Sequence, residues 1–154
     1  MLRTVVKEVR KTKFIIPGEP TGKARPRVTK WGTHTPEKTV LYENLVKTAY
    51  DGILHDGYIE MNVKAFYGIP KSVSKKKHLE MKTGKILPTK KPDCDNVLKI
   101  IADALNKIAY NDDAQIVRAT VEKRYSENPR VVVEINEIKS FLSRLEQMQE
   151  IAEE

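Results

Sequence analysis

The chain has 154 residues, of which 32% are charged and 40% hydrophobic, and its formal net charge is +7. This composition suits one soluble domain with a hydrophobic core, excludes a disordered chain, and leaves no apolar run long enough to span a bilayer. The first 90 residues carry 19 lysines and arginines against 8 acidic residues, an excess typical of polyanion binders that also occurs in ordinary soluble proteins.

A short strand, a basic loop and a helix are expected first. Residues 13–18 (KFIIPG) predict a strand that ends at a Pro-Gly turn, and residues 19–35 have the Gly, Pro and Thr content of a loop. Residues 35–53 predict a helix with Thr35 as its cap and Pro36 at its first position. The apolar side chains expected on one face of that helix are Val40, Leu41, Leu45 and Ala49.

The middle of the chain predicts a strand, a basic loop and a second helix. Residues 58–68 alternate apolar and polar side chains, as a half-buried strand does. Residues 70–92 predict a loop with eight lysines and room for one helical turn in its middle. A helix is expected from Asn96 to Lys107. Its buried side should carry Val97, Leu98, Ile101, Ala104, Leu105 and Ile108.

The last elements expected are two strands and a helix. Residues 114–127 and 130–138 predict two antiparallel strands joined through Asn128-Pro129. Residues 139–154 predict an amphipathic helix with Phe141, Leu145, Met148 and Ala152 in register. The order of elements predicts an α+β fold, a single domain in which helices pack against a mixed sheet.

The sequence also bears on the compartment. A single cysteine, Cys94, cannot form an internal disulfide, and the first twenty residues lack the continuous apolar core of a signal peptide. We therefore expect a reducing compartment, most simply the cytoplasm.

Acidic residues flank the second predicted helix. If residues 93–95 are extended, Asp93 and Asp95 point to the same side, and Asp95 can also cap the helix. Asp112 and Asp113 follow the helix and can reach the same site if the chain doubles back. Carboxylates gathered in this way repel one another unless a divalent cation binds, and oxygen ligands without His or Cys favour Mg²⁺ or Mn²⁺ over zinc. The alternative is that each motif is only a helix cap or a turn.

Lys99 lies four residues after Asp95, one helical turn further along. The ordinary interpretation is a surface ion pair. The functional alternative places its ammonium beside a scissile phosphate. Asn96 suits a capping position, and Asp103, one turn beyond Lys99, suits a solvated or supporting position.

KPDCDNVLKIIADAL followed by YNDDAQIV resembles the RusA family of Holliday junction resolvases, small bacterial and prophage endonucleases. The opening IPGEPTGKARPRVT is also similar to that family, and the likeness spans most of residues 13 to 137. The matching positions are Pro92, Asp93, Asp95, Asn96, Lys99, Asp103, Ala104, Leu105, Asp112, Asp113, Gln115 and Ile116.

The resemblance implies a RusA-like α+β endonuclease domain, which we place over residues 1–138. The amphipathic helix expected over 139–154 looks like an extension beyond the core that the family shares. It implies that Asp93, Asp95 and Asp113 are the metal-binding catalytic aspartates and Lys99 the essential lysine, with Asp112 a less certain partner. It also implies a homodimer that uses Mg²⁺, with Mn²⁺ as a substitute, to make paired nicks across four-way DNA junctions in recombination and repair.

The basic segments are the expected DNA contacts. Phosphate contacts position a protein on DNA without reading its sequence, and no fixed bidentate geometry for reading bases is apparent here. Two other functions explain part of the sequence: a non-enzymatic DNA-binding protein, and an Asp-x-Asp metal enzyme acting on nucleotide sugars or phosphoesters, although no Gly-rich phosphate loop is present. The candidate backbone contacts are Lys23, Arg25, Arg27, Lys30, Lys90 and Lys91.

Overall fold

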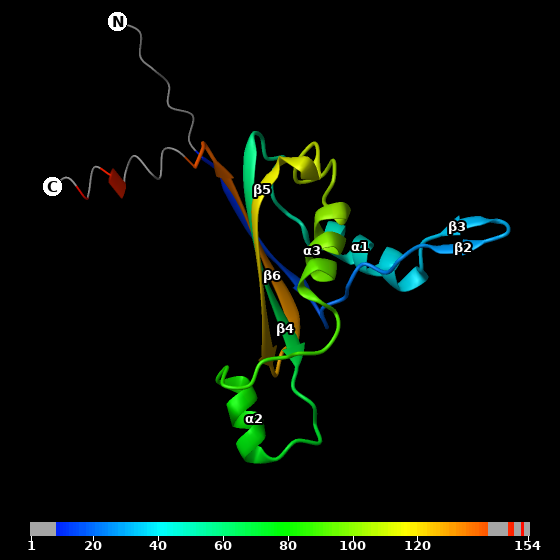
Figure 1. The fold of residues 1–154 in the computed structure, drawn as a ribbon, viewed down its shortest axis with the longest axis vertical. Helices are drawn as coiled ribbons and strands as arrows, with labels where there is room; N and C mark the ends of the chain where they lie inside the picture. The colour runs from blue at the N-terminus through cyan, green and yellow to red at the C-terminus, as the bar shows by residue number, and fades with distance from the viewer. Residues whose placement is uncertain (1–8, 142–147, 150–151, 153–154) are drawn as a thin grey trace, which may run out of the picture.

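A computed structural model describes residues 9–141, 148–149 and 152. Its centre is a four-stranded mixed sheet in the order β1-β6-β4-β5, with helices α1 and α3 packed on one face (Figure 1), so the predicted α+β fold is confirmed. The strands are β1 (Lys11–Pro17), β4 (Tyr58–Gly68), β5 (Ile116–Ser126) and β6 (Arg130–Ile138). Within residues 9–141 the helices are α1 (Glu37–Ala49), α2 (Lys75–Lys82) and α3 (Cys94–Ala104), with one 3-10 turn, η1 (Asp113–Gln115).

The connection from β4 to β5 determines where the acidic residues lie. β4 and β5 are parallel neighbours, and a parallel pair needs a long crossover, which here contains α2, α3 and η1. The crossover helix α3 runs back along the sheet. Its start therefore lies by the end of β4, where the Tyr67 hydroxyl donates to the Pro92 carbonyl at 2.6 Å, and its end lies by the start of β5.

The core lies between the sheet and the two helices. In β4 the predicted alternation is confirmed, because Ile59, Met61, Val63, Ala65 and Tyr67 are all buried. Helix α3 buries Val97, Ile100, Ile101, Ala102 and Ala104 against the sheet. Ile108, expected on that buried side, is 37% exposed because the helix ends at Ala104.

Helix α1 differs from its prediction in both its start and its buried face. Pro36 precedes the helix without any side-chain cap bond, so Thr35 is not the cap. The fully buried residues of the helix are Thr39, Tyr42 and Val46, while Leu45 and Ala49 of the predicted face are partly buried against the core. Two of the residues predicted to be buried, Val40 and Leu41, are 42% and 61% exposed.

Three further predictions are corrected. The expected loop over residues 19–35 contains a hairpin of β2 (Arg27–Thr29) and β3 (Gly32–His34), which leaves the body of the protein on the side of α1 and α3 (Figure 1). The expected helical turn in residues 70–92 is the eight-residue helix α2. The last two strands run in opposite directions as predicted, but β4 lies between them and pairs with both.

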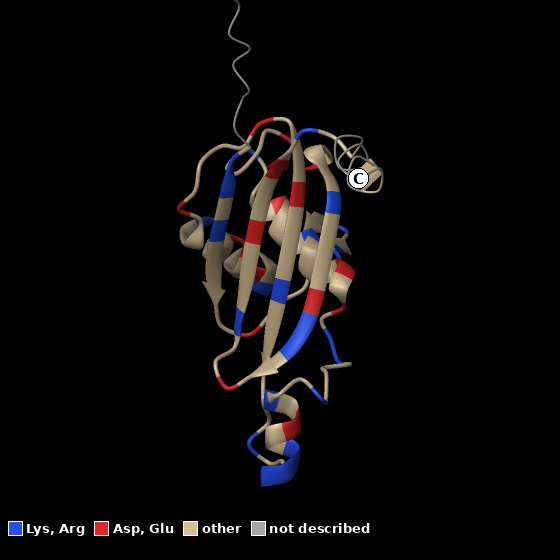
Figure 2. Cartoon of the chain, turned by 90° about the vertical axis from the view of Figure 1, so that its left-hand side faces the viewer, with Lys and Arg blue, Asp and Glu red and all other residues tan. Residues whose placement is uncertain are grey.

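The other face of the sheet carries no helix among the described residues, and both Lys/Arg and Asp/Glu residues occur along its strands (Figure 2). Several of these charges pair, including Arg118 with Glu60 at 3.0 Å and Lys11 with Glu134 at 3.6 Å. The predicted C-terminal helix falls mostly on residues 142–147, 150–151 and 153–154, which lie outside the described residues. Among the described helices, none has the length and hydropathy that crossing a membrane requires.

Candidate active site

A polar stripe runs along the exposed side of α3. Asp95, Lys99 and Asp103 are four residues apart and therefore lie on one side of the helix, away from its apolar stripe. The Lys99 ammonium lies 3.6 Å from an Asp103 carboxylate oxygen. This pairing is with the residue that follows Lys99 by one turn, not with Asp95, which precedes it.

The segment before β5 brings Asp113 to the C-terminal end of this stripe. The Asp113 amide donates to the Asn106 side-chain oxygen at 2.9 Å, which fixes η1 just beyond the end of α3. Asp112 caps the turn, because its carboxylate accepts from the Ala114 amide at 2.8 Å while the Gln115 side chain accepts from the Asp112 amide. Asp112 therefore has a local structural role, and Asp113 is free to face the stripe.

An open cavity of about 370 Å³ joins these side chains. Three carboxylates line it, from Asp95, Asp103 and Asp113, together with the Lys99 ammonium. Helix α3 and strand β5 provide its apolar floor. The structure thus brings together three of the four predicted catalytic residues, Asp95, Asp113 and Lys99, and adds Asp103.

The electrostatics of this cavity reflect its crowded negative charge. Partial burial raises the pKa of Asp113 above its ordinary value, the neighbouring Asp112 and Asp103 carboxylates raise it further, and the Lys99 ammonium opposes them. The pKa of Asp112 is lowered, first by the Ala114 amide and then by its interaction with Asp113. A cation bound in the cavity would stabilise the charged form of Asp113 and so lower its raised pKa.

Asp93 does not face this cavity. It precedes α3 as the residue before the first helical turn, with extended backbone angles, whereas Asp95 is already inside that turn. Residues two apart on a helix point in different directions, so the expected extended stretch with Asp93 and Asp95 side by side is not formed. Asp93 lines a second cavity of about 610 Å³, together with Lys23, Lys90 and Asn96.

The start of α3 is held firmly against the loop that follows β1. The Lys23 amide donates to the Asn96 carbonyl at 3.0 Å. Gly22 packs so closely that an added Cβ would lie 2.7 Å from the Pro92 side chain. On the other side, the Lys123 ammonium donates to the Lys90 carbonyl at 2.6 Å. These contacts fix the backbone that presents Asp93.

Lys23 is a bridge between carboxylates. Its ammonium pairs with Glu43 of α1 and lies 3.4 Å from the Asp103 carboxylate, with 21% of its side chain exposed. Burial alone would lower the pKa of Lys23, but the two carboxylates outweigh it and raise that pKa above its ordinary value. Asp103 therefore joins Lys23 to Lys99.

The regular spacing of Asp95, Lys99 and Asp103 was the signal in the sequence that could have identified Asp103 as a site residue.

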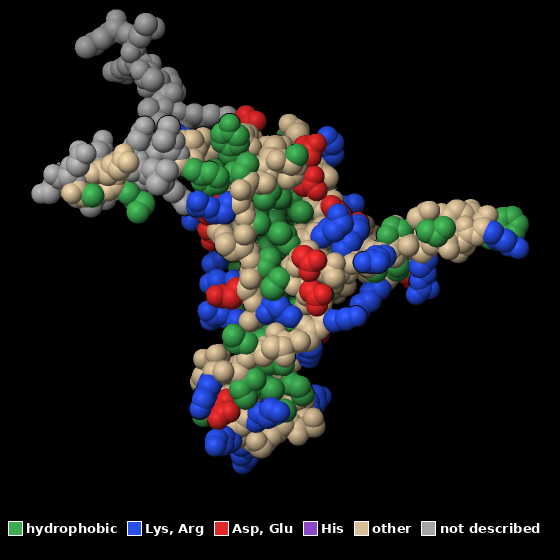
Figure 3. Space-filling view, viewed as in Figure 1, with side chains coloured by type: hydrophobic (Ala, Val, Ile, Leu, Met, Phe, Trp, Pro, Cys, Tyr) green, Lys and Arg blue, Asp and Glu red, His purple; other side chains and the backbone are tan. Residues whose placement is uncertain are grey.

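The other predicted DNA contacts are exposed. Arg25, Arg27 and Lys30 lie on the approach to the β2–β3 hairpin or on the hairpin itself, and Lys90 and Lys91 lie just before α3. Acidic side chains gather over α3 and the segment before β5, and basic side chains flank them toward the hairpin (Figure 3).

The fit of a metal ion rests on the donors in the smaller cavity. Across residues 9–141, 148–149 and 152, no three His, Cys, Asp or Glu side chains are already arranged to hold a metal ion. The carboxylates of Asp95, Asp103 and Asp113 nevertheless line one open cavity, and carboxylate oxygens are what Mg²⁺ and Mn²⁺ prefer. The donor chemistry suits such an ion, and binding would need the three side chains to draw together.

Comparison with known proteins adds independent findings. A family model described as Endodeoxyribonuclease RusA matches residues 17–136. A Bacillus subtilis (strain 168) protein described as "Uncharacterized protein YqaN" is 39% identical over 136 residues, which cover 82% of this chain and 96% of that protein. A Lactococcus phage r1t protein described as "Crossover junction endodeoxyribonuclease rusA" is 33% identical over 81 residues, 52% of this chain and 55% of that protein.

Proposed function

Because the chain belongs to the RusA family of endodeoxyribonucleases, we propose that it resolves four-way DNA junctions by metal-dependent, paired and symmetric nicks, in DNA recombination and repair. The matched residues 17–136 include the whole acidic cavity and the basic segments that flank it. The observation that carries the proposal is the common cavity of Asp95, Lys99 and Asp113, because it combines the donors for a divalent cation with a positive charge for phosphate.

We assign the metal site to Asp95 and Asp113, with Asp93 as the third ligand that the family resemblance implies and Asp103 beside them. A bound Mg²⁺ or Mn²⁺ would neutralise phosphate charge and lower the pKa of a water molecule. Asp93 lies at the neighbouring cavity. Because the backbone at the start of α3 is held in place, its participation requires the Asp93 side chain to turn toward Asp95 when DNA and metal bind.

The protein's own cations supply the remaining stabilisation. A phosphodiester carries a negative charge that grows on its oxygens as the bond to the leaving group breaks. Lys99 faces the cavity and would lie beside that charge, and Asp103 holds its ammonium in place from 3.6 Å. Asp103 is thus a positioning residue for Lys99, and Lys23 ties the same carboxylate to the loop after β1.

Paired cuts require two active sites. One cavity can cut one strand at a time, and a four-way junction is resolved only when two symmetric strands are cut. A homodimer with a two-fold axis meets this requirement, as the family resemblance implies.

The test is nicking of a synthetic mobile four-way junction in Mg²⁺, with cut positions mapped on all four arms and a linear duplex as comparison. We expect paired cuts on the junction, no cuts on the duplex, and no cutting in EDTA. Asp95→Asn should abolish cutting while junction binding is kept or strengthened, because the substitution removes negative charge near DNA.

Two results would count against this function. If Asp95→Asn lost binding and cutting in equal measure, the carboxylate would be needed for the fold or for binding rather than for chemistry. If wild type bound junctions without cutting in Mg²⁺ or Mn²⁺, and Asp95→Asn behaved like wild type, a non-enzymatic DNA-binding protein would be the better description.

A further inference from the structure

The β2–β3 hairpin, residues 27–34, extends from the body of the protein into solvent (Figure 1). Trp31, the only tryptophan in the sequence, lies in the turn between its strands and is 82% exposed. Val28 is 81% exposed on the same hairpin. Large aromatic side chains usually lie in a core or an interface, where their area is covered. Trp31 contributes nothing to the core of this protein.

The hairpin is also strongly and uniformly positive. Residues 20–36 contain no aspartate or glutamate, and among the described residues no ion pair is formed by Arg25, Arg27 or Lys30. The Lys30 ammonium lies 5.2 Å from the centre of the Trp31 ring. The hairpin therefore presents one aromatic face with uncompensated cations beside it and behind it.

This combination matches nucleic acid with accessible base faces. Proteins that bind unpaired or unstacked bases combine a positive surface for the backbone with aromatic side chains on which bases stack. In a continuous duplex every base face is covered by its neighbours, whereas strands change partners at a branch point and the stack is interrupted there. An exposed indole flanked by cations is thus suited to a branch point and of little use on an uninterrupted helix.

We propose that the hairpin is a junction-reading arm, in which Trp31 stacks on a base exposed at the branch point while Arg25, Arg27 and Lys30 contact the adjacent phosphates. The inference deepens the proposed function, since it assumes branched DNA as the ligand. The hairpin lies on the side of the sheet that carries α3 (Figures 1 and 3). An arm fixed at the branch point would therefore hold the flanking strand near the acidic cavity.

The main alternative is that Trp31 packs against a second copy of the chain. Charge favours DNA, because a two-fold axis that brought two hairpins together would oppose like charges. A hairpin that instead reached the body of the second copy would bury Trp31, and its truncation would weaken the dimer. The oligomeric state of Trp31→Ala therefore distinguishes stacking on DNA from packing against a second copy.

The experiment measures binding of the full chain, without Mg²⁺, to a four-way junction with 2-aminopurine at its branch point and to a linear duplex of matched sequence. Trp31→Ala should weaken junction binding about 5- to 140-fold, the range expected when one base–aromatic stack is lost. Trp31→Phe should restore most of it. The 2-aminopurine fluorescence change seen with wild type should disappear in Trp31→Ala, and duplex affinity should stay the same.

A matched control is Leu41→Ala, which removes another exposed apolar side chain, 61% exposed on α1, and should leave both affinities unchanged. Because Trp31 is exposed, Trp31→Ala should unfold at the wild-type temperature. Equal junction affinity and fluorescence in wild type and Trp31→Ala would overturn the proposal, as would a change of oligomeric state by sedimentation.

The outcome is separable from that of the proposed function. If wild type cuts junctions and Trp31→Ala cuts them with the same KM, the arm is not used and the nuclease assignment stands. If Trp31 is needed for junction binding but wild type never cuts, the arm stands and the nuclease assignment fails.

Discussion

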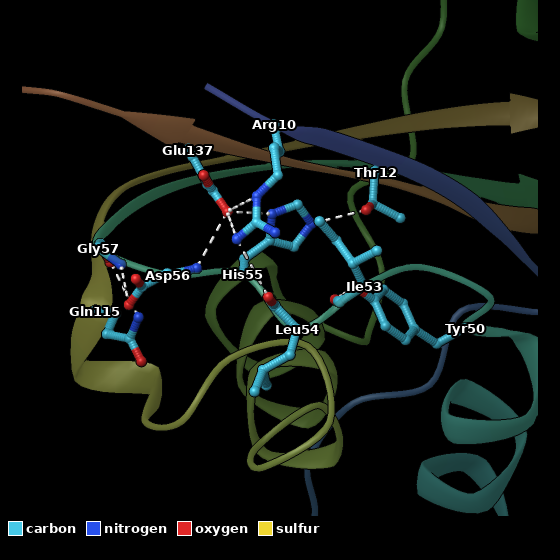
Figure 4. Close-up of polar contacts among 10 residues, drawn as sticks. All are labelled: Arg10, Thr12, Tyr50, Ile53, Leu54, His55, Asp56, Gly57, Gln115 and Glu137. Carbon is cyan, nitrogen blue, oxygen red and sulfur yellow. Dashed lines mark hydrogen bonds and ion pairs between the residues drawn. The ribbon is translucent and has the colours of Figure 1, made fainter. Parts of the chain in front are cut away.

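The buried carboxylate of Glu137 has a structural role, whereas the carboxylates of Asp95 and Asp113 belong to the candidate site. Glu137, 7% exposed, accepts from the Arg10 guanidinium at 3.0 Å, the Asp56 amide at 3.1 Å and the His55 ring at 3.1 Å (Figure 4). His55 in turn contacts the Thr12 hydroxyl at 2.7 Å. Thr12, His55 and Glu137 are all buried, and their hydrogen bonds join β1 to β6 through the segment before β4.

This network predicts how stability depends on pH. Burial alone would raise the pKa of Glu137, but the hydrogen bonds from Arg10, Asp56 and His55 outweigh it and lower that pKa to about 2. A carboxyl whose pKa is lower in the folded than in the unfolded chain contributes its full stability above the ordinary value, near 4.5. That contribution is lost as the pH falls from about 4.5 to about 2.

Glu137→Gln should therefore lower the free energy of unfolding at pH 7 by about 1.5–3 kcal/mol, because Arg10 and His55 lose their charged hydrogen-bond partner. It should also flatten the loss of stability between these two pH values. Urea unfolding followed by circular dichroism from pH 2 to pH 7 measures both. Parallel pH profiles for the variant and wild type would contradict this account of Glu137.

At the scale of elements, α3 carries two different stripes. Val97, Ile101 and Ala104 face the sheet, while Asp95, Lys99 and Asp103 face the cavity. Both stripes follow from one helical period, so the core that fixes the helix also fixes the spacing of the charged groups. As long as the helix is folded, its charged stripe therefore keeps this spacing.

The two stripes should respond differently to substitution. Lys99→Met should lower kcat for junction cutting about 100- to 1000-fold, as loss of one stabilising donor does, while thermal stability is unchanged, since the Lys99 side chain is 62% exposed. Ile101→Ala should lower the free energy of unfolding by about 2–5 kcal/mol and cut at the wild-type rate at temperatures where it stays folded.

The measurements are single-turnover cutting and thermal melts on both variants. Lys64, exposed on the opposite face of the sheet, provides the control, since Lys64→Met should change neither quantity. If Lys99→Met were as active as wild type, Lys99 would have no role in cutting and would only form a surface ion pair with Asp103.

At the scale of the whole molecule, basic segments flank the acidic cavity on the face that carries α3. The hairpin and the lysine-rich segment of residues 70–92 lie on two sides of the acidic cavity (Figures 1 and 3). On the uncovered face of the sheet, by contrast, charged side chains form ion pairs with one another, such as Lys11 with Glu134 and Arg118 with Glu60. DNA should therefore bind on the face that carries α3.

Junction affinity should fall steeply as salt rises, because each phosphate contact releases counterions. Replacement of Lys75, Lys76 and Lys77 in α2 by alanine should reduce the slope of log K against log salt by about 0.9 for each lysine that contacts phosphate. Titrations from low to moderate salt measure this slope, with Lys64→Ala as the control. An unchanged slope in the triple variant would remove α2 from the DNA-binding surface.

Predictions from the sequence were accurate where the determining forces are local. The limits of β4 were predicted to the residue, because alternation of apolar and polar side chains is a direct consequence of strand geometry. The face of α1 was predicted only in part, because apolar residues occur around much of that helix and only packing selects Thr39, Tyr42 and Val46 for full burial. The β2–β3 hairpin was missed because its strands are three residues long and carry little pattern.

The sequence by itself determined the fold class, the apolar stripe of α3 and the residue types of the candidate site, since periodicity and side-chain chemistry are properties of the chain. Tertiary structure decided which strands are neighbours and which carboxylates meet. By making β4 and β5 parallel neighbours, it carries α3 back along the sheet, so Asp113 joins Asp103 at the end of the helix and Asp93 stays at its start. Distant segments pair because they bury large surfaces against one another, and the area that they bury is defined only in the folded chain.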